Sequence, residues 1–263
     1  MARSADPPPA LGCKQTDRSS IQPVTLRTPV AWRRRGLDWL FPPTCALCGA
    51  PGQPGLDLCT PCERELPGNL RACPACAQPW PLAQPADPLC RRCRRRPPPF
   101  TAAHVPFLYE GILPALIAGA KFRGRLHLVR LVGTLLARAL AEQRATRPAL
   151  LVPVPLHASR LRERGYNQAH EIARTVATEL GLAVDARCCE RIRATSPQMG
   201  LTGTARRRNL RGAFGLRAVP DADHIAVIDD VVTTGTTAAE LARTLLRTGV
   251  VTRVDLWGVA RTP

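Results

Sequence analysis

Two acidic residues and a loop of threonine and glycine form the part of this sequence best suited to chemistry. The run "IAVIDDVVTTGTT" spans residues 225–237 and places Asp229 and Asp230 after four apolar residues. This order predicts a buried strand that delivers both carboxylates to its carboxyl end. Gly235 then allows the backbone to approach a ligand closely, and the first N–H groups of a following helix attract an anion. The segment therefore predicts a phosphate cradle beside two carboxylates.

The two carboxylates repel phosphate, so we expect them to serve another part of the ligand. Adjacent sugar hydroxyls would donate hydrogen bonds to them, and a bound cation is the other role open to them. A P-loop is excluded because its Gly-x-x-x-x-Gly-Lys-Ser/Thr pattern needs a lysine that this segment lacks. An acid that is phosphorylated, as in a response regulator, would leave the Thr-Thr-Gly-Thr-Thr loop without a role.

The other residues suited to chemistry are four Cys-x-x-Cys pairs between residues 45 and 93. Each pair places two sulfurs on one tight turn, and two pairs supply the four thiolates that tetrahedral Zn²⁺ prefers. A thioredoxin-type redox pair would occur once. Four pairs, separated by 10, 10 and 13 residues, fit two structural zinc sites better than a disulfide framework or an iron–sulfur cluster. Sequential and interleaved pairing both remain open. The predicted ligands are Cys45, Cys48, Cys59, Cys62, Cys73, Cys76, Cys90 and Cys93.

Strands that alternate with helices must position these residues. Around the acid pair we expect a strand at 224–228 and a helix at 237–248 that stops at Gly249. This alternation is typical of an α/β fold, in which a mainly parallel sheet carries helices on its faces. The other predicted elements are helices at 30–41, 112–122, 125–143 and 166–180, strands at 150–155, within 183–193, at 213–217 and at 250–259, and an exposed loop at 194–212.

The composition excludes two classes of protein. At 45% hydrophobic residues, the 263-residue chain is not disordered throughout. Arg130 and Arg138 interrupt the apolar run at 126–141, which is shorter than the roughly 20 apolar residues that span a bilayer. Because no signal-peptide core is present either, we expect a cytoplasmic protein without membrane insertion. In that compartment paired cysteines bind metal more often than they form disulfides.

Charge and proline are distributed unevenly along the chain. The net charge of +17 favours a polyanionic partner, although residues 221–263 carry more acid than base. Of the 27 prolines, 19 precede residue 101, so the front of the chain needs the cysteines as staples in place of an ordinary core. The predicted domains are a disordered tail over 1–36, a double zinc ribbon with a leading short helix over 37–100, and an α/β domain over 101–263.

Several motifs together resemble a known family. Residues 225–237 are compatible at all 13 positions with the signature of type I phosphoribosyltransferases. The motifs "RGYNQA" (164–169) and "AKFRGR" (120–125) and the paired zinc knuckles make the chain similar to the ComF-type competence family from about residue 37 to its end. The resemblance implies a sheet of the type I phosphoribosyltransferase kind, preceded by a small zinc-ribbon domain.

The resemblance also implies a ligand and its site. The pair Asp229 and Asp230, in the catalytic position, would bind the ribose hydroxyls of phosphoribosyl pyrophosphate, which Mg²⁺ accompanies. The threonine loop would hold its 5′-phosphate. Arginines after the first core strand, Arg160 and Arg164, would meet the pyrophosphate, and a closing loop would include Arg206–Asn209. The implied substrate-binding residues are Thr233, Thr234, Gly235, Thr236, Thr237, Arg164 and Arg207.

Two functions follow from these motifs. The first is transfer of the phosphoribosyl group to an acceptor that the sequence does not disclose, linked to DNA uptake or utilisation during natural transformation. The second is a non-catalytic competence protein that binds single-stranded DNA and retains the phosphoribosyl site. Arginine runs at 91–96 and 206–211 favour phosphate neutralisation, whereas only 4% aromatic residues limit base stacking. Other competence proteins are further expected partners.

Overall fold

The computed structural model describes residues 42–80, 87–120, 125–143, 145–194 and 210–263. These residues all belong to one compact unit, which runs from Pro42 to Pro263. The expected tail at 1–36, the helix at 30–41 and Arg206–Asn209 of the expected closing loop lie outside the described residues.

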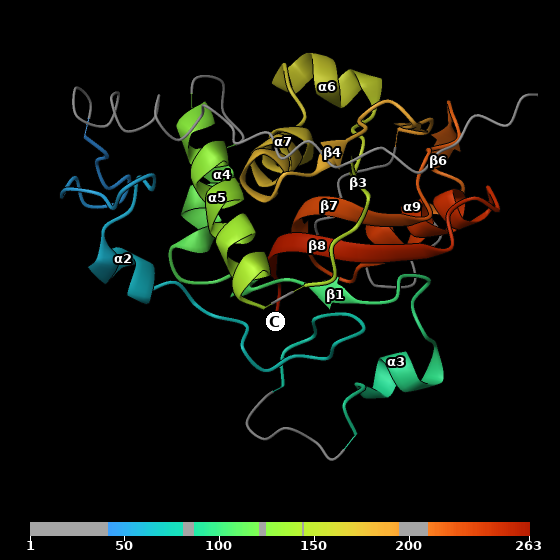
Figure 1. Cartoon of the computed structure of the whole chain (residues 1–263), viewed down its shortest axis with the longest axis horizontal. Coiled ribbons are helices and arrows are strands. Elements are labelled where there is room, and N and C mark those ends of the chain that lie inside the picture. The colour runs from blue at the N-terminus through green and yellow to red at the C-terminus, as the bar shows by residue number, and fades with distance from the viewer. Residues whose placement is uncertain (1–41, 81–86, 121–124, 144, 195–209) are drawn as a thin grey trace, which may run out of the picture. The chain divides into compact units, whose positions relative to one another are not determined.

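A parallel sheet forms the centre of this unit (Figure 1). β7 (His224–Val232) lies between β8 (Arg253–Arg261) and β3 (Leu150–Pro153). All strand pairs of this sheet are parallel, which confirms the predicted mainly parallel α/β fold. The outer strands are β1 (Ala103–His104) and β2 (Phe107–Leu108), both paired with β8, and β4 (Ala183–Val184), paired with β3.

Helices cover both faces of the sheet. Along β7, Ala226 and Ile228 belong to the apolar cluster of one face, whereas Ile225 and Val227 belong to that of the other. This alternation follows from the two-residue period of a strand, and burial on both faces explains the continuous apolar run of β7. Figure 1 shows α5 and α7 close together and α9 near β7 and β8. The first face packs against α4 (Leu113–Gly119), α5 (Leu126–Glu142) and α7 (Gln168–Leu180), and the second against α9 (Thr236–Leu246).

Local signals explain where α7 begins and ends. The Asn167 side chain accepts a hydrogen bond from the N–H of Ala169, which is an N-cap contact, and Gly181 ends the helix at φ +68°. A further helix, α6 (Ala158–Arg164), was not among the predicted elements. It lacks an apolar face, and its ends are set by the capping side chain of His157 and by Gly165 at φ +82°.

A second, smaller sheet flanks residues 195–209. The strand expected within 183–193 is two short strands, because β5 (Cys189–Arg191) leaves the main sheet and pairs antiparallel with β6 (Phe214–Leu216). This hairpin brings the two ends of the Arg-rich segment together near α9, whose Glu240 accepts a hydrogen bond from the N–H of Gly212 at 2.7 Å.

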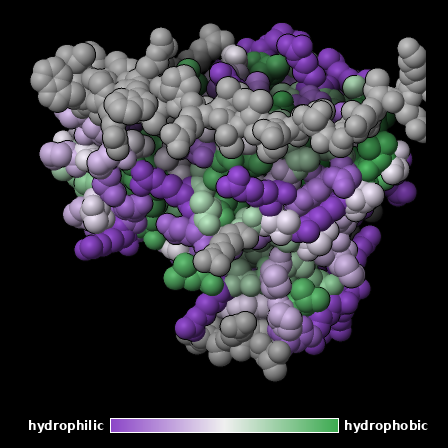
Figure 2. Space-filling model, viewed as in Figure 1, coloured by the Kyte–Doolittle hydropathy of each residue, from purple (hydrophilic) through white to green (hydrophobic). Residues whose placement is uncertain are grey.

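Two short helices organise the cysteine-rich front of the described chain. α2 (Thr60–Arg64) starts after Cys59 and α3 (Arg91–Arg95) starts after Cys90, so that each helix carries the second cysteine of its pair on its first turns. Among the described helices, none combines the length and apolar character needed to cross a membrane. On the face shown in Figure 2, hydrophilic residues are spread over much of the described surface, with smaller hydrophobic patches between them.

Candidate functional site

The eight predicted zinc ligands form two groups of four. The sulfurs of each group lie within 4.8 Å of one another. In the second group the Sγ atoms of Cys76 and Cys90 are 3.7 Å apart, close to the roughly 3.8 Å expected between sulfurs that surround Zn²⁺ at about 2.3 Å. The structure therefore selects sequential pairing. The first tetrad is Cys45, Cys48, Cys59 and Cys62, and the second tetrad is Cys73, Cys76, Cys90 and Cys93.

The donor chemistry of both tetrads fits structural Zn²⁺. All ten described cysteines are free thiols, and four sulfurs in a compact group match the closed sites that hold this ion without an open position. Burial raises the pKa of Cys45, but hydrogen bonds from backbone N–H groups, that of Cys59 first, outweigh this and lower it to about 6. Burial raises the pKa of Cys76 to about 11, an effect that a backbone hydrogen bond at Gln78 reduces. Zn²⁺ would supply the positive charge that four neighbouring thiolates require.

The acid pair lies at the carboxyl end of β7. Asp229 is in register with Gly258 of β8, and both carboxylates are half-buried. The N–H of Asp230 donates to Oδ1 of Asp229 at 3.0 Å, and the N–H of Val231 donates to Oδ1 of Asp230 at 2.8 Å. Each carboxylate is thus oriented by the backbone of the strand, at the sheet edge where open α/β folds bind their ligands.

The threonine loop (residues 233–237) continues directly from the acid pair into α9. Gly235 takes the left-handed conformation at φ +70° and is the N-cap of the helix, which is the position where the helix dipole attracts an anion. The hydroxyls of Thr234 and Thr236 are 2.6 Å apart, and the loop is half-exposed. The loop carbonyls are held by arginines: Arg92 Nη2 donates to Thr234 O at 2.9 Å, and Arg261 Nη1 donates to Thr233 O.

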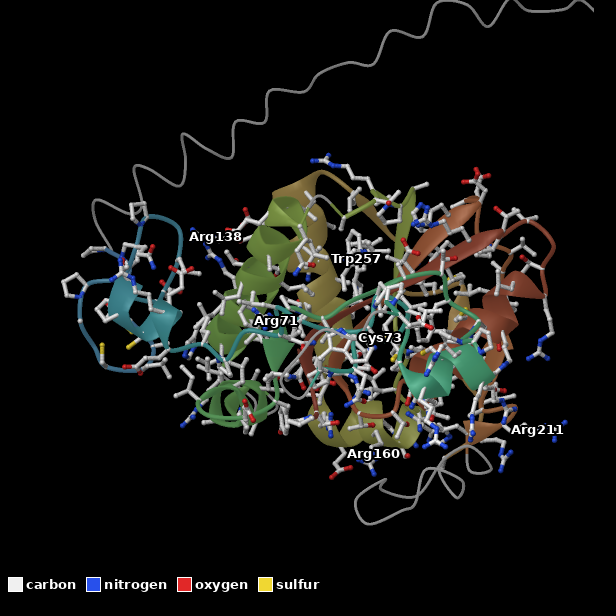
Figure 3. The ribbon with its side chains drawn as sticks, turned by 90° about the horizontal axis from the view of Figure 1, so that it is seen from below. Arg71, Cys73, Arg138, Arg160, Arg211 and Trp257 are labelled. Atoms are coloured by element: carbon white, nitrogen blue, oxygen red, sulfur yellow. The ribbon has the colours of Figure 1, made fainter. Side chains whose placement is uncertain are left out.

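Arg191 is close enough to interact electrostatically with both Asp229 and Arg160. Burial lowers the pKa of Arg191, the negative charge of Asp229 raises it, and the neighbouring charge of Arg160 lowers it. Arg191 ends β5 and forms a parallel bridge with His157, the residue before α6. Figure 3 shows Arg160 on α6. The end of β5 and the segment after β3 therefore meet beside the acid pair, and they bring positive charge to it.

The "RGYNQA" motif contacts the backbone around the site. The hydroxyl of Tyr166 donates to the carbonyl of Ala120, and Asn167 Nδ2 donates to Val154 O at 3.0 Å. Burial raises the pKa of Tyr166, whereas the charge of Arg164 lowers it. Arg164, which is predicted to contact pyrophosphate, is the last residue of α6 and lies two positions before this tyrosine. The motif ties α4, the end of β3 and the start of α7 together.

A groove of about 810 Å³ opens beside the threonine loop. It is lined by Thr234, Gly235 and Thr236 of the loop and by Phe100. Glu240 also lines it and pairs with Arg243, which offsets part of the positive charge. Its basic residues lie on α3 and directly after it, shortly before β6, and on α9 and directly after it. These are Arg92, Arg96, Arg211, Arg243 and Arg247.

The structure groups most of the predicted site residues and adds three. The acid pair and the threonine loop lie together at the end of β7, whereas Arg207 lies outside the described residues. Sequence reasoning did not single out Arg92, Arg191 and Arg261. Arg92 belongs to the arginine run at 91–96, so the sequence did indicate a basic surface there. Arg191 and Arg261 are the last residues of β5 and β8, and no motif in the sequence marks either of them.

The fold and site define a class of protein: a double zinc ribbon in front of a parallel α/β sheet consistent with the phosphoribosyltransferase-like fold. The family model "Double zinc ribbon domain" matches residues 36–96. The DNA utilization protein YhgH of Salmonella typhimurium strain LT2 is 36% identical over 226 residues, which cover 84% of this chain and 98% of that protein. Its namesake from Escherichia coli strain K12 is 34% identical with the same coverage.

The chain belongs to the ComF-type family of these proteins. Competence protein F of Haemophilus influenzae strain Rd is 29% identical over 78% of this chain and 90% of that protein. Among solved structures, that of TT1426 from Thermus thermophilus matches with 18% identity and a TM-score of 0.27, covering 53% of this chain and 85% of that one, a likeness too low to support a fold argument.

Proposed function

We propose that this protein binds Mg²⁺-phosphoribosyl pyrophosphate at the threonine loop and the acid pair, and that it acts in DNA uptake or utilisation. The observation that carries the proposal is the continuous order of a half-buried acid pair, a loop with left-handed Gly235 and the N-terminus of α9. The relatives named for DNA utilization and for competence support the second part of the proposal.

Each part of the donor has a counterpart in this order. Threonine hydroxyls and N–H groups at the start of α9 suit the 5′-phosphate, because both donate hydrogen bonds and the helix dipole adds positive potential. The carboxylates of Asp229 and Asp230 suit the ribose hydroxyls as acceptors. Mg²⁺ is commonly held by one or two carboxylates together with substrate phosphates, and when bound it would neutralise the pyrophosphate. Arg160 and Arg191 supply fixed positive charge on the same side.

The transfer reaction needs little general base chemistry from the protein. Departure of pyrophosphate from the anomeric carbon is favoured by cations around the leaving group, and exclusion of water protects the reactive sugar. Consumption of the donor, measured against a panel of bases and nucleic acids, tests whether transfer occurs and identifies the acceptor.

Isothermal titration with Mg²⁺-phosphoribosyl pyrophosphate tests the binding site. We expect Asp229→Asn/Asp230→Asn to weaken binding by at least about tenfold, because hydrogen bonds to a charged acceptor contribute roughly 1.5–3 kcal/mol each. The matched control is Asp223→Asn, which removes an exposed carboxylate just before β7, at the opposite end of the strand. Equal affinity of the wild type and the double variant would refute the assignment.

The groove beside the loop favours a second candidate function, binding of single-stranded DNA through its phosphates. Five arginines line this groove, and Phe100 is its one aromatic residue among those described. Arginine binds phosphate in a bidentate manner, so contacts to the DNA backbone would dominate over base stacking. The two functions are compatible, because the groove and the donor site share only the threonine loop.

A further inference from the structure

The second tetrad is connected to the threonine loop through Gln78. This residue closes the turn of the first knuckle of that tetrad, because its carbonyl accepts a hydrogen bond from the N–H of Cys73 at 2.9 Å. Its side-chain Oε1 accepts a hydrogen bond from Nη2 of Arg261 at 2.6 Å. The conformation of the knuckle therefore determines where the acceptor for this arginine lies.

Arg261 carries the connection from the knuckle to the loop. It ends β8, and only 2% of its surface is exposed. Its Nη1 donates to Val232 O at 3.0 Å and to Thr233 O, which are the carbonyls where β7 passes into the threonine loop. A buried guanidinium needs negative charge nearby. As thiolates, Cys76, Cys90 and Cys93 are close enough to raise its pKa, although burial lowers it more.

Two more contacts, one from the ribbon and one from the segment directly after it, reach the next two residues of the loop. Arg92 lies between two ligands of the second tetrad, on α3, and donates to Thr234 O at 2.9 Å. Phe100 follows the ribbon and packs against Gly235, where its Cζ would lie 3.6 Å from an added Cβ. Three successive loop residues are thus contacted in turn: residue 233 by Arg261, residue 234 by Arg92 and residue 235 by Phe100.

The first tetrad has different neighbours. Cys45 and Cys59 belong to the apolar cluster that includes α4 and α5, on the other face of the sheet. The carbonyl of Pro54 accepts a hydrogen bond from Arg138 of α5 at 3.3 Å, and Figure 3 shows Arg138 on this helix near the segment of the first tetrad. The second tetrad forms an apolar cluster of its own, to which Trp80 and Leu89 add.

We infer that the second zinc site positions the threonine loop for its ligand, with Gln78, Arg261 and Arg92 as positioning residues, whereas the first zinc site only stabilises the fold. Four thiolates around one Zn²⁺ retain two negative charges, which provide the counter-charge for buried Arg261. Loss of this metal removes both the counter-charge and the fixed knuckle. The inference rests on the proposed binding of phosphoribosyl pyrophosphate.

Matched zinc-site variants of the full chain test this inference. Cys93→Ser and Cys62→Ser each remove the second cysteine of the last pair of one tetrad. Zinc analysis should find about one ion fewer per chain in both variants. Titration with Mg²⁺-phosphoribosyl pyrophosphate should give about tenfold weaker binding for Cys93→Ser and an unchanged dissociation constant for Cys62→Ser. Equal losses in both variants, or no loss in either, would overturn the inference.

A second pair of variants keeps both zinc ions and guards against misfolding of the cysteine variants. Gln78→Ala removes the acceptor for Arg261, and we expect three- to tenfold weaker binding, less than the full value of one hydrogen bond to a charged group, because Arg261 keeps its own contacts with the loop. Gln78→Glu retains an oxygen acceptor and should restore the affinity. Zinc content should remain at the wild-type value in both variants, and Gln78→Glu should also keep the wild-type melting temperature. Failure of Gln78→Glu to restore the affinity lost in Gln78→Ala would contradict the positioning role.

Hydrogen exchange separates this inference from the proposed function. Amides of residues 233–237 should exchange faster in Cys93→Ser and Gln78→Ala than in Cys62→Ser, with or without the donor. If the wild type does not bind the donor, the proposed function fails, and the exchange rates alone decide the inference. If the wild type binds and the loop amides exchange equally in all three variants, the inference fails and the proposed function stands.

Discussion

Tyr166, Asn167 and Gln168 direct polar atoms at three backbone carbonyls on two segments of the chain. Their partners are Ala120 at the end of α4, Val154 after β3, and Ile117 within α4. Gln168 is 4% exposed, so its side chain contacts protein rather than solvent or a ligand. At the scale of single residues, this motif has a structural role: its hydrogen bonds fix the backbone that leads from β3 into α6.

Substitution of Asn167 measures how much its hydrogen bonds contribute to the free energy of unfolding. Asn167→Ala removes both the N-cap acceptor of α7 and the donor to Val154 O, and we expect the free energy of unfolding to fall by about 2 kcal/mol. Asn167→Ser keeps a capping oxygen and should lose about half as much. Urea denaturation checks both values.

The control for this measurement is Thr178→Ala on the same helix. Thr178 is exposed and its hydroxyl donates only to Arg174 O, one turn earlier, so its loss should change stability by less than about 0.5 kcal/mol. If Asn167→Ser is as unstable as Asn167→Ala, the cap is not the source of the stability.

At the residue scale, fixed spacings in the sequence predicted which residues lie together, whereas contacts that leave no pattern were missed. The eight cysteines and the acid–threonine segment have fixed spacings, and the structure places them in compact groups. Arg261 has no such pattern. It is buried and hydrogen-bonded to Gln78, a partner 183 positions away, whereas an arginine is ordinarily expected at the surface. Only the folded structure reveals this contact.

At the scale of elements, the close approach of β7 and β8 sets the position of the threonine loop. Gly258 lies opposite Asp229, and a Cβ added there would be 2.7 Å from Cγ2 of Val232. The residue before the loop therefore packs into the space that the glycine leaves. The same kind of tight contact occurs between α5 and α7, where a Cβ on Gly133 would be 2.7 Å from Cβ of Thr175.

These two glycines form a matched pair of test positions. Gly258→Ala should lower the free energy of unfolding by about 1–3 kcal/mol, as overpacking does, and displace Val232 with the loop that follows. Its affinity for Mg²⁺-phosphoribosyl pyrophosphate should fall by about tenfold. Calorimetric melting and isothermal titration give the two values.

Gly133→Ala is the control because its contact is equally tight but lies between two helices away from the loop. It should destabilise the protein by a similar amount, because the added Cβ meets the Cβ of Thr175, which cannot rotate away, while the better helix propensity of alanine returns about 1 kcal/mol. It should leave the dissociation constant unchanged. Equal loss of affinity in both variants would show that general stability, rather than the β7–β8 contact, governs the site.

The sequence predicted long elements well and short ones poorly, for a physical reason. Helices at 125–143 and 166–180 correspond to α5 and α7, whose apolar faces pack in the core. In contrast, α6 has no buried residue and β5 has three residues, so neither leaves a periodic pattern. Strand 224–228 continues through the acid pair to Val232, because pairing with β8 persists where the apolar run ends.

At the scale of the whole molecule, a part of the positive charge lines a groove whose arginines suit phosphates. The net charge of +17 falls by four when both tetrads are deprotonated and hold Zn²⁺, and the protein stays strongly basic. The groove beside the threonine loop gathers five arginines from segments far apart in the sequence. Arg211, labelled in Figure 3, is one of them and is exposed. A basic groove predicts DNA binding that weakens steeply with salt.

Two arginines on different segments of this groove provide the test. Arg96 follows α3 and Arg247 follows α9, and both are exposed residues of the groove lining. If both neutralise phosphates of single-stranded DNA, Arg96→Ala/Arg247→Ala should reduce the slope of log affinity against log salt by about 1.4, or about 0.7 per contact. Fluorescence anisotropy with a labelled oligonucleotide, recorded from about 50 to 200 mM salt, measures this slope.

The control Arg174→Ala/Arg187→Ala removes the same charge from exposed positions outside the groove lining and should leave the slope unchanged. A similar reduction in both double variants would mean that net charge attracts DNA without a defined path, and the groove would then lose its claim as the binding site.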